Sequence, residues 1–145
     1  MRHLCDSNVF LALAVGQHLH HRRAAAWFAG LVAADKAEFC RATQISFLRL
    51  LTQKIAPEYL PVSNEAGRAA FDQLMEDDVV EFAMEPENID SVWRSFGDLV
   101  TAAPKVWMDS YLAAFAIAAG MRFVTMDGDF KRFENHGLDL LLLHS

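Results

Sequence analysis

Three aspartates in this chain each follow an apolar run, where a charged side chain is least expected. They are Asp6, Asp109 and Asp127. In an open parallel sheet, ligands bind outside the carboxyl ends of the strands, and side chains from several strands meet there. A group of carboxylates repels itself unless it is protonated or neutralised by a bound cation. The positions of these aspartates therefore predict a divalent metal site.

Asp6 is followed by Ser7 and Asn8, and all three residue types commonly cap the start of a helix. A single helix needs only one cap, so this run contains more capping residues than local structure requires. A carboxylate at the end of a strand is also a suitable ligand for a hard cation. We therefore interpret Asp6 as a metal ligand rather than as a cap alone.

Asp109 and Asp127 each have an ordinary structural explanation when considered alone. Asp109 precedes the apolar helix expected over Ser110–Ala119, and an acidic residue there stabilises the helix dipole. Asp127 begins an Asp-Gly turn, and Asp129 either caps the short helix that follows or adds another ligand. Their occurrence together with Asp6 favours the metal site.

Strands alternate with helices along the chain. The alternation predicts an α/β fold with a mainly parallel five-stranded sheet and a functional crevice at the carboxyl ends of its strands. The expected strands are His3–Cys5, Lys36–Cys40, Val79–Ala83, Arg122–Val124 and Leu138–Leu143. The expected helices are Asn8–Val15, His21–Ala34, Thr43–Lys54 with Thr43 as its cap, a helix opening at Ser63-Asn64-Glu65, Ile89–Phe96, Ser110–Ala119 closed by Gly120, and a short helix near Phe130–Phe133.

The length and composition predict a single globular domain over residues 1–145. The chain is 53% hydrophobic and 22% charged, and 145 residues can bury a sizeable core. No apolar stretch is long enough to span a membrane, and Asp6 comes too early for a signal peptide. Cys5 and Cys40 are expected to be buried free thiols, as is usual in the reducing cytoplasm.

The net charge of −6 argues against binding nucleic acid through bulk electrostatic attraction. The charge is uneven, because residues 1–57 contain seven Lys and Arg against three Asp and Glu, whereas residues 58–98 contain two against eleven. A local basic rim remains available, formed by Arg22, Arg23, Arg41, Arg49 and Lys54.

The other polar and aromatic candidates are weaker. His18, His20 and His21 are expected in a loop and at a helix start, since nothing beside them completes a zinc site. The sequence contains neither a Gly-rich phosphate loop nor a Gly-x-Ser-x-Gly nucleophile turn. The tryptophans, Trp27, Trp93 and Trp107, are expected in the core or at a partner contact rather than as platforms for bases.

Four segments resemble, in order, the four motifs of PIN-domain ribonucleases, particularly the VapC-type toxins of bacterial toxin–antitoxin pairs. The segments are Leu4–Leu13, Cys40–Leu50, Met108–Ala114 and Val124–Phe130. The resemblance implies a three-layer α/β/α domain that cleaves RNA with Mg²⁺ or Mn²⁺. It implies that Asp6, Asp109 and Asp127 are catalytic and hold the metal, that Asp129 is a further ligand, and that Ser7 and Asn8 orient Asp6.

Gln44 departs from this pattern, because the second motif usually carries a glutamate at that position. A glutamine carbonyl can ligate a cation but adds no negative charge, so a second metal is less strongly held. The resemblance also implies a homodimer and a small antitoxin that blocks the cleft. Contacts with the RNA backbone are expected from Arg41, Arg49 and Lys54.

Two other functions remain open at the level of sequence. The chain could be a binding or regulatory module that keeps the fold but has a weakened site because of Gln44. It could also be a receiver-like phosphoryl-transfer protein, which shares acidic strand ends. The latter is disfavoured because the nearest lysine to a late strand, Lys131, lies beyond the turn.

Overall fold

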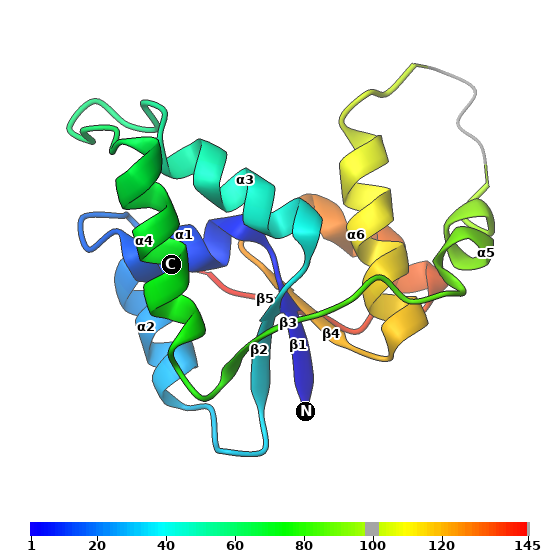
Figure 1. The fold of residues 1–145 in the computed structure, drawn as a ribbon. Coiled ribbons are helices and arrows are strands. Elements are labelled where there is room, and N and C mark those ends of the chain that lie inside the picture. Colours follow the sequence, from blue (N-terminus) through cyan, green and yellow to red (C-terminus); the bar gives the residue numbers. More distant parts are fainter. Residues whose placement is uncertain (98–101, 145) are drawn as a thin grey trace.

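The central sheet has five strands, all parallel, in the order β3-β2-β1-β4-β5. The computed structural model describes residues 1–97 and 102–144, and Figure 1 shows the strands at the centre of the molecule with helices on both sides. The first strand of the chain is therefore the middle strand of the sheet. The bounds are β1 (Arg2–Cys5), β2 (Lys36–Phe39), β3 (Val80–Phe82), β4 (Arg122–Thr125) and β5 (Leu140–Leu142).

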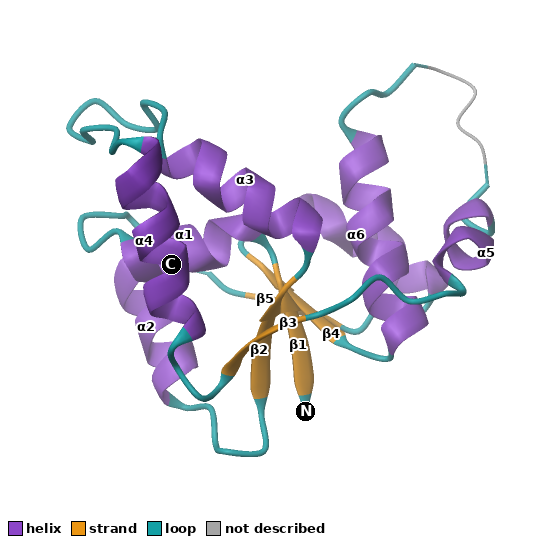
Figure 2. Cartoon of the chain, viewed as in Figure 1, coloured by secondary structure: helices purple, strands orange, loops and turns teal. Residues whose placement is uncertain are grey.

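The helices form two groups, one on each face of the sheet (Figure 2). One group consists of α1 (Ser7–Ala14), α2 (His21–Ala29), α3 (Arg41–Leu51) and α4 (Asn64–Met75). The other consists of α5 (Ile89–Arg94), α6 (Val106–Ala119) and the 3₁₀ helix η1 (Gly128–His136). This arrangement confirms the predicted three-layer α/β/α architecture.

Successive residues of the central strands face opposite cores, as the two-residue period of a strand requires. Leu4 and Phe123 pack into the core beneath α6, whereas Cys5 and Val124 pack into the core beneath α1. All four side chains are fully buried. Both faces of β1 and β4 are thus apolar, so only the ends of these strands can present polar groups to solvent.

Small side chains allow α6 to approach the sheet closely. Ala113, Ala114 and Ala116 are completely buried in the core that contains Phe123 of β4. Gly120 then ends the helix with a φ of 68°, a left-handed conformation that glycine adopts without strain. The prediction that Gly120 closes this helix is confirmed.

Several predicted helix boundaries were wrong, among them the end of α2, the start of α3 and the start of α6. Helix α2 ends at Ala29 rather than Ala34. Helix α3 begins at Arg41 after the N-cap Cys40, so Thr43 is not the cap. Its hydroxyl instead accepts the backbone N–H of Cys40 at 2.9 Å, which makes it the reciprocal partner in a capping box. Helix α6 begins at Val106, so Asp109 is its fourth residue and does not precede it.

One charged side chain lies inside the sheet. Glu38 on β2 is 1% exposed, and the guanidinium of Arg2 on β1 donates to both of its carboxylate oxygens at 2.8 and 3.1 Å. Cys5 and Cys40 are buried and free, as predicted. Among the described residues, no helix is both long and apolar enough to cross a membrane.

Candidate active site

Asp6 and Asp127 lie at the same edge of the sheet because they follow two neighbouring parallel strands. Cys5 of β1 is paired with Val124 of β4. The backbone N–H of Asp6 donates to the carbonyl of Val124 at 2.8 Å, which continues the ladder by one residue. Asp127 lies two residues beyond the end of β4. The expected convergence at the carboxyl ends of the strands is therefore observed.

The carboxylate of Asp6 is held in place by hydrogen bonds to both of its oxygens. Oδ1 accepts the backbone N–H of Ser7 at 2.8 Å, which makes Asp6 the N-cap of α1. Oδ2 accepts from the side-chain amide of Asn8 at 3.3 Å and from the hydroxyl of Thr125 at 2.7 Å. Asp6 thus caps α1 and also presents a carboxylate whose orientation is fixed. Ser7 and Asn8 both contact it, as expected.

Thr125 is a site residue that the sequence analysis did not identify. It is fully buried at the end of β4, and its hydroxyl also accepts the backbone N–H of Asp127 at 3.0 Å. The side-chain oxygen of Asn8 accepts the backbone N–H of Met126 at 3.3 Å. The sequence did contain a signal for this contact with Asp6 and Asp127. Thr125 is a hydroxyl residue at the end of an apolar strand, two positions before Asp127.

Burial raises the pKa of Asp6 to about 6, and the negative charges of Asp109 and Asp127 add to this effect. The hydrogen bonds from Thr125 and Ser7 oppose the rise because they stabilise the ionised carboxylate. Asp109 and Asp127, which belong to other parts of the chain, therefore lie within electrostatic reach of Asp6. This supports the prediction that they form one group.

Asp109 enters the site from α6 and is partly buried. Its pKa is raised, first by burial and then by the charges of Asp127 and Asp129, while Arg132 and Lys105 lower it. Asp109 is therefore subject to opposing effects from the acidic Asp127 and Asp129 and from the basic Arg132 and Lys105. The cations offset part of the repulsion within the acidic group.

Asp127 and Asp129 are joined by a turn. Oδ1 of Asp127 accepts the backbone N–H of Asp129 at 2.9 Å, which makes Asp127 the N-cap of η1. The prediction that Asp127 begins a turn is thus also correct. Asp129 is exposed and lies close enough to raise the pKa of Asp109. Among the described residues, no group of three or more His, Cys, Asp or Glu side chains is placed so that it could hold a metal ion.

Gln44 is buried in the first half of α3, and its carbonyl oxygen accepts a hydrogen bond from the guanidinium of Arg41. Arg41 also lies over the ring of Phe82, 4.7 Å from its centroid. The oxygen that could have ligated a cation is therefore already bound to a positive charge. Arg49 lies in the last turn of α3 and Lys54 beyond it, so the predicted RNA-binding residues are spread along this helix rather than gathered at one end.

The histidines and tryptophans differ in how well they match the predictions. His18 and His20 lie in the loop before α2, and His21 is its first residue, as expected. Trp27 packs edge-on against His3 with centroids 5.4 Å apart. Trp107 is 69% exposed, which excludes the core for this residue and leaves the partner contact as the prediction.

Comparisons with known proteins were made for both sequence and structure. The PIN domain family matches residues 4–135. Ribonuclease VapC41 of Mycobacterium tuberculosis is 43% identical over 144 residues, covering 97% of each chain. Ribonuclease VapC44 of the same species is 34% identical over 130 residues, covering 88% of this chain and 87% of the relative.

Solved structures share the fold at low sequence identity. VapBC2 of Rickettsia felis, bound to a DNA fragment of its promoter, superimposes with a TM-score of 0.68 and 13% identity, covering 99% of this chain and 100% of the other. VapC20 of M. tuberculosis, described as a toxin that cleaves the sarcin–ricin loop, gives a TM-score of 0.64 and 16% identity, covering 90% and 93%.

Proposed function

The chain belongs to the PIN domain family, and from this membership and its carboxylate group we propose that it is an endoribonuclease acting as the toxin of a toxin–antitoxin pair. The relatives that are 43% and 34% identical are both named as ribonucleases. The observation that carries the proposal is that Asp6 and Asp127 follow the neighbouring parallel strands β1 and β4 at one end of the sheet. The charges of Asp127 and of Asp109 on α6 both help to raise the pKa of Asp6. We take residues 1–145 as one PIN domain.

We propose that cleavage requires Mg²⁺ or Mn²⁺. Mg²⁺ usually keeps several waters and binds through one or two carboxylates, so it does not need a finished protein cage. Asp6, Asp109 and Asp127 would hold the ion, and Asp129 is a further candidate ligand. The bound ion would activate water and offset charge on the phosphate oxygens.

The residues around Asp6 support its proposed role as a metal ligand. Burial favours the neutral carboxylic acid, and the hydrogen bonds from these residues favour and orient the ionised carboxylate. Hydrogen bonds from Ser7, Asn8 and Thr125 leave both oxygens oriented by the ends of β1 and β4. Such supporting contacts generally determine the orientation and affinity of metal ligands. Asp6, the most constrained of the three aspartates, is therefore the proposed anchor of the site.

We propose that one cation binds tightly rather than two. Gln44 replaces an acidic residue with a neutral one, and its oxygen accepts from Arg41. A guanidinium at that position adds positive charge where a second cation would need negative charge. Arg41 therefore disfavours a second ion beside Gln44.

The proposed partners are an RNA substrate, a small antitoxin and a second copy of the chain. VapBC assemblies are among the solved structures with this fold, which favours an antitoxin partner. Arg41, Arg49 and Lys54 are the proposed contacts with the RNA backbone. Replacing one that neutralises a phosphate of single-stranded RNA should reduce the salt dependence of the binding constant by a slope of roughly 0.7.

The test is cleavage of bacterial RNA by the purified protein in Mn²⁺ or Mg²⁺, with EDTA as the metal-free control. Asp6→Ala and Asp109→Asn should each abolish cutting. Asp139→Asn is the matched control, because Asp139 is an exposed acid paired with Arg122 before β5 and away from the site. Cleavage by either site variant at the wild-type rate would refute the assignment.

The alternative, a binding module with a weakened site, is favoured by one observation, the contact between Gln44 and Arg41. Calorimetry with Mn²⁺ separates the two functions. Binding that is lost in Asp6→Ala supports the nuclease. No binding at millimolar Mn²⁺, together with tight binding of a protein partner, supports the module.

A further inference from the structure

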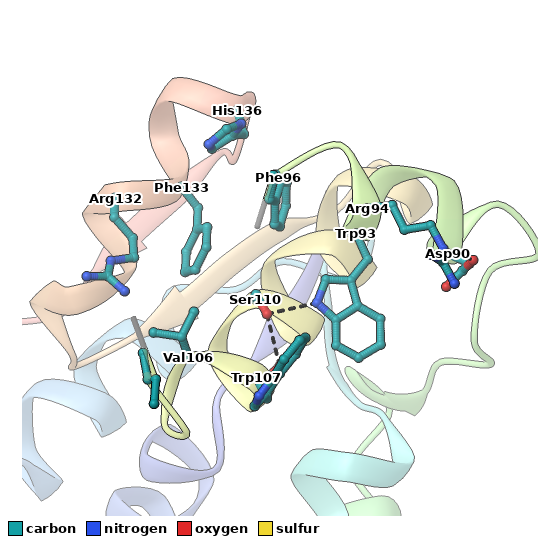
Figure 3. Close-up of a pocket in the computed structure, with 13 residues that line it drawn as sticks. Asp90, Trp93, Arg94, Phe96, Val106, Trp107, Ser110, Arg132, Phe133 and His136 are labelled. Carbon is teal, nitrogen blue, oxygen red and sulfur yellow. Dashed lines mark hydrogen bonds and ion pairs between the residues drawn. The ribbon is translucent and has the colours of Figure 1, made fainter. Parts of the chain in front are cut away.

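A pocket of about 930 Å³ lies between α5, α6 and η1. Figure 3 shows the side chains that line it, with Trp93 on α5, Trp107 and Ser110 on α6, and Arg132, Phe133 and His136 on η1. Most of its described lining is aromatic or cationic. These lining residues have no part in the proposed metal site and make none of the hydrogen bonds to Asp6.

Two indole rings form a corner of the pocket. The rings of Trp93 and Trp107 have centroids 6.3 Å apart and are inclined by 81°. The ring N–H of Trp93 donates to the hydroxyl of Ser110 at 2.8 Å, and that hydroxyl donates to the backbone carbonyl of Trp107 at 3.0 Å. Ser110 is buried, so these bonds fix Trp93 in position, while Trp107 keeps 69% of its surface exposed.

The opposite wall combines rings with positive charge. The centroid of the Phe96 ring lies 4.8 Å from the ring centroid of His136 and 5.4 Å from that of Phe133. Arg132 also lines the pocket, and its charge lowers the pKa of Asp109. The same guanidinium therefore lies beside the pocket and within electrostatic reach of the acidic group.

Helix α6 connects the two sites. Val106 and Ser110 line the pocket, and Asp109 stands between them in the sequence on the same helix. A strand of RNA that places a phosphate near Asp109 would therefore have a neighbouring base within reach of this pocket. The cation on the wall suits the phosphate, and the exposed indole suits the flat face of a base.

We propose that this pocket binds one nucleobase of the RNA strand, by stacking on Trp107, while Arg132 contacts the adjoining phosphate. The proposal rests on the nuclease function proposed above. It reverses the prediction that the tryptophans do not serve as platforms for bases. Because every base has a flat face, stacking of this kind tolerates several sequences.

The test measures binding without cleavage, in EDTA, by fluorescence anisotropy. The probes are a labelled single-stranded oligouridylate of about ten nucleotides, a length within the usual range for one binding site, and an abasic oligoribose phosphate of equal length and charge. Trp107→Ala should weaken binding of the oligouridylate by about 5-fold to 100-fold, as loss of one stacked base predicts. It should leave binding of the abasic probe unchanged.

Met108→Ala is the matched control, because Met108 is the next residue of α6, is exposed and does not line the pocket. It should bind both probes as the wild type does. Arg132→Ala should weaken both probes by the same factor, since it removes a charge rather than a ring. If Trp107→Ala binds both probes like the control, or weakens both equally, the base pocket is refuted.

Cleavage in Mn²⁺ separates failure of this inference from failure of the nuclease function. A raised KM in Trp107→Ala with an unchanged kcat supports the pocket. If the wild type cleaves RNA and Trp107→Ala has the same KM and the same affinity, the nuclease function stands and the base pocket is refuted. Base-dependent binding by a protein that cleaves nothing refutes the nuclease and retains the pocket as an RNA-binding site.

Discussion

The hydroxyl of Thr125 donates a 2.7 Å hydrogen bond to Oδ2 of Asp6, across 119 positions of sequence. The same oxygen of Thr125 accepts the backbone N–H of Asp127. One buried hydroxyl thus connects a carboxylate after β1 to the backbone that carries a carboxylate after β4. This side chain therefore helps to fix the relative position of the two aspartates, together with the pairing of β1 with β4 and the contact between Asn8 and Met126.

We expect Thr125→Val to disturb the site more than its small change in shape suggests. The variant removes a donor to Asp6 and an acceptor for the N–H of Asp127, and an unpaired buried polar group costs about 1–3 kcal/mol. Cleavage should fall by roughly 10-fold to 100-fold, as for other contacts that orient metal ligands. Urea unfolding and single-turnover cleavage measure the two effects. Thr125→Ser keeps the hydroxyl and should restore most of the activity; an inactive but stable Ser variant would contradict this role.

The stability of the metal-free protein should decrease as the pH rises through about 6. The pKa of Asp6 is raised from 3.8 to about 6 in the folded protein, so the folded state binds this proton more tightly than the unfolded state does. The resulting stabilisation is complete below about pH 3.8 and is lost as the carboxyl ionises. Asp6→Asn avoids this loss and should unfold with a free energy higher by up to about 3 kcal/mol at neutral pH in EDTA.

Urea melts of the wild type and Asp6→Asn, at about pH 4 and about pH 7.5, test this expectation. The two proteins should be nearly equally stable at the lower pH and should diverge at the higher pH. Adding Mn²⁺ at the higher pH should stabilise the wild type and not the variant, because only the wild type has the ionised carboxylate. A constant difference at both pH values would show that titration of Asp6 does not contribute.

Gln44→Glu should change the number of bound ions. The new carboxylate would pair with Arg41 and supply the negative charge that a second cation requires. We expect calorimetry with Mn²⁺ to show one site in the wild type and a second, weaker site in Gln44→Glu. The double variant Arg41→Ala/Gln44→Glu should bind the second ion more tightly than Gln44→Glu, because the competing guanidinium is absent. Two equal sites in the wild type would refute the one-ion proposal.

Arg2→Met should reduce stability without affecting the chemistry. It leaves the carboxylate of Glu38 buried and without its bidentate partner, while Arg2 itself begins β1, at the end of that strand opposite Asp6. Breaking a buried pair typically costs 3–5 kcal/mol, and the exposed half of Arg2 reduces this to about 2–4 kcal/mol. The Tm should fall while kcat at a permissive temperature remains that of the wild type. Arg122→Met, which breaks an exposed pair with Asp139, should have little effect on either quantity.

The fold was predictable from sequence because its signals are local and repeated. Short apolar runs alternate with helical spacing, and all five expected strands occur in the parallel sheet. The helix starts were harder to predict. The expected start at Ser110 was wrong because Val106 and Trp107 belong to the helix although Trp107 is largely exposed. Spacing alone does not distinguish an exposed first turn from a loop.

The aspartates of the site were predictable, but the contacts that hold them were not. Asp6 and Asp127 follow strands, so their convergence follows from the parallel sheet. The role of Thr125 depends on the order of strands, because β1 and β4 must be neighbours for its hydroxyl to reach Asp6. The contact between Arg41 and Gln44 depends on a rotamer, which a sequence pattern does not specify.

The central position of β1 also affects when the protein becomes active during synthesis. The ribosome makes Asp127 more than a hundred residues after Asp6. Until β4 emerges, the middle strand has no neighbour on one side and Asp6 lacks the hydroxyl of Thr125. A nascent chain that stops before β4 therefore cannot assemble the carboxylate group. An RNA-cutting protein built in this order therefore lacks its complete carboxylate group until β4 and Asp127 have been made.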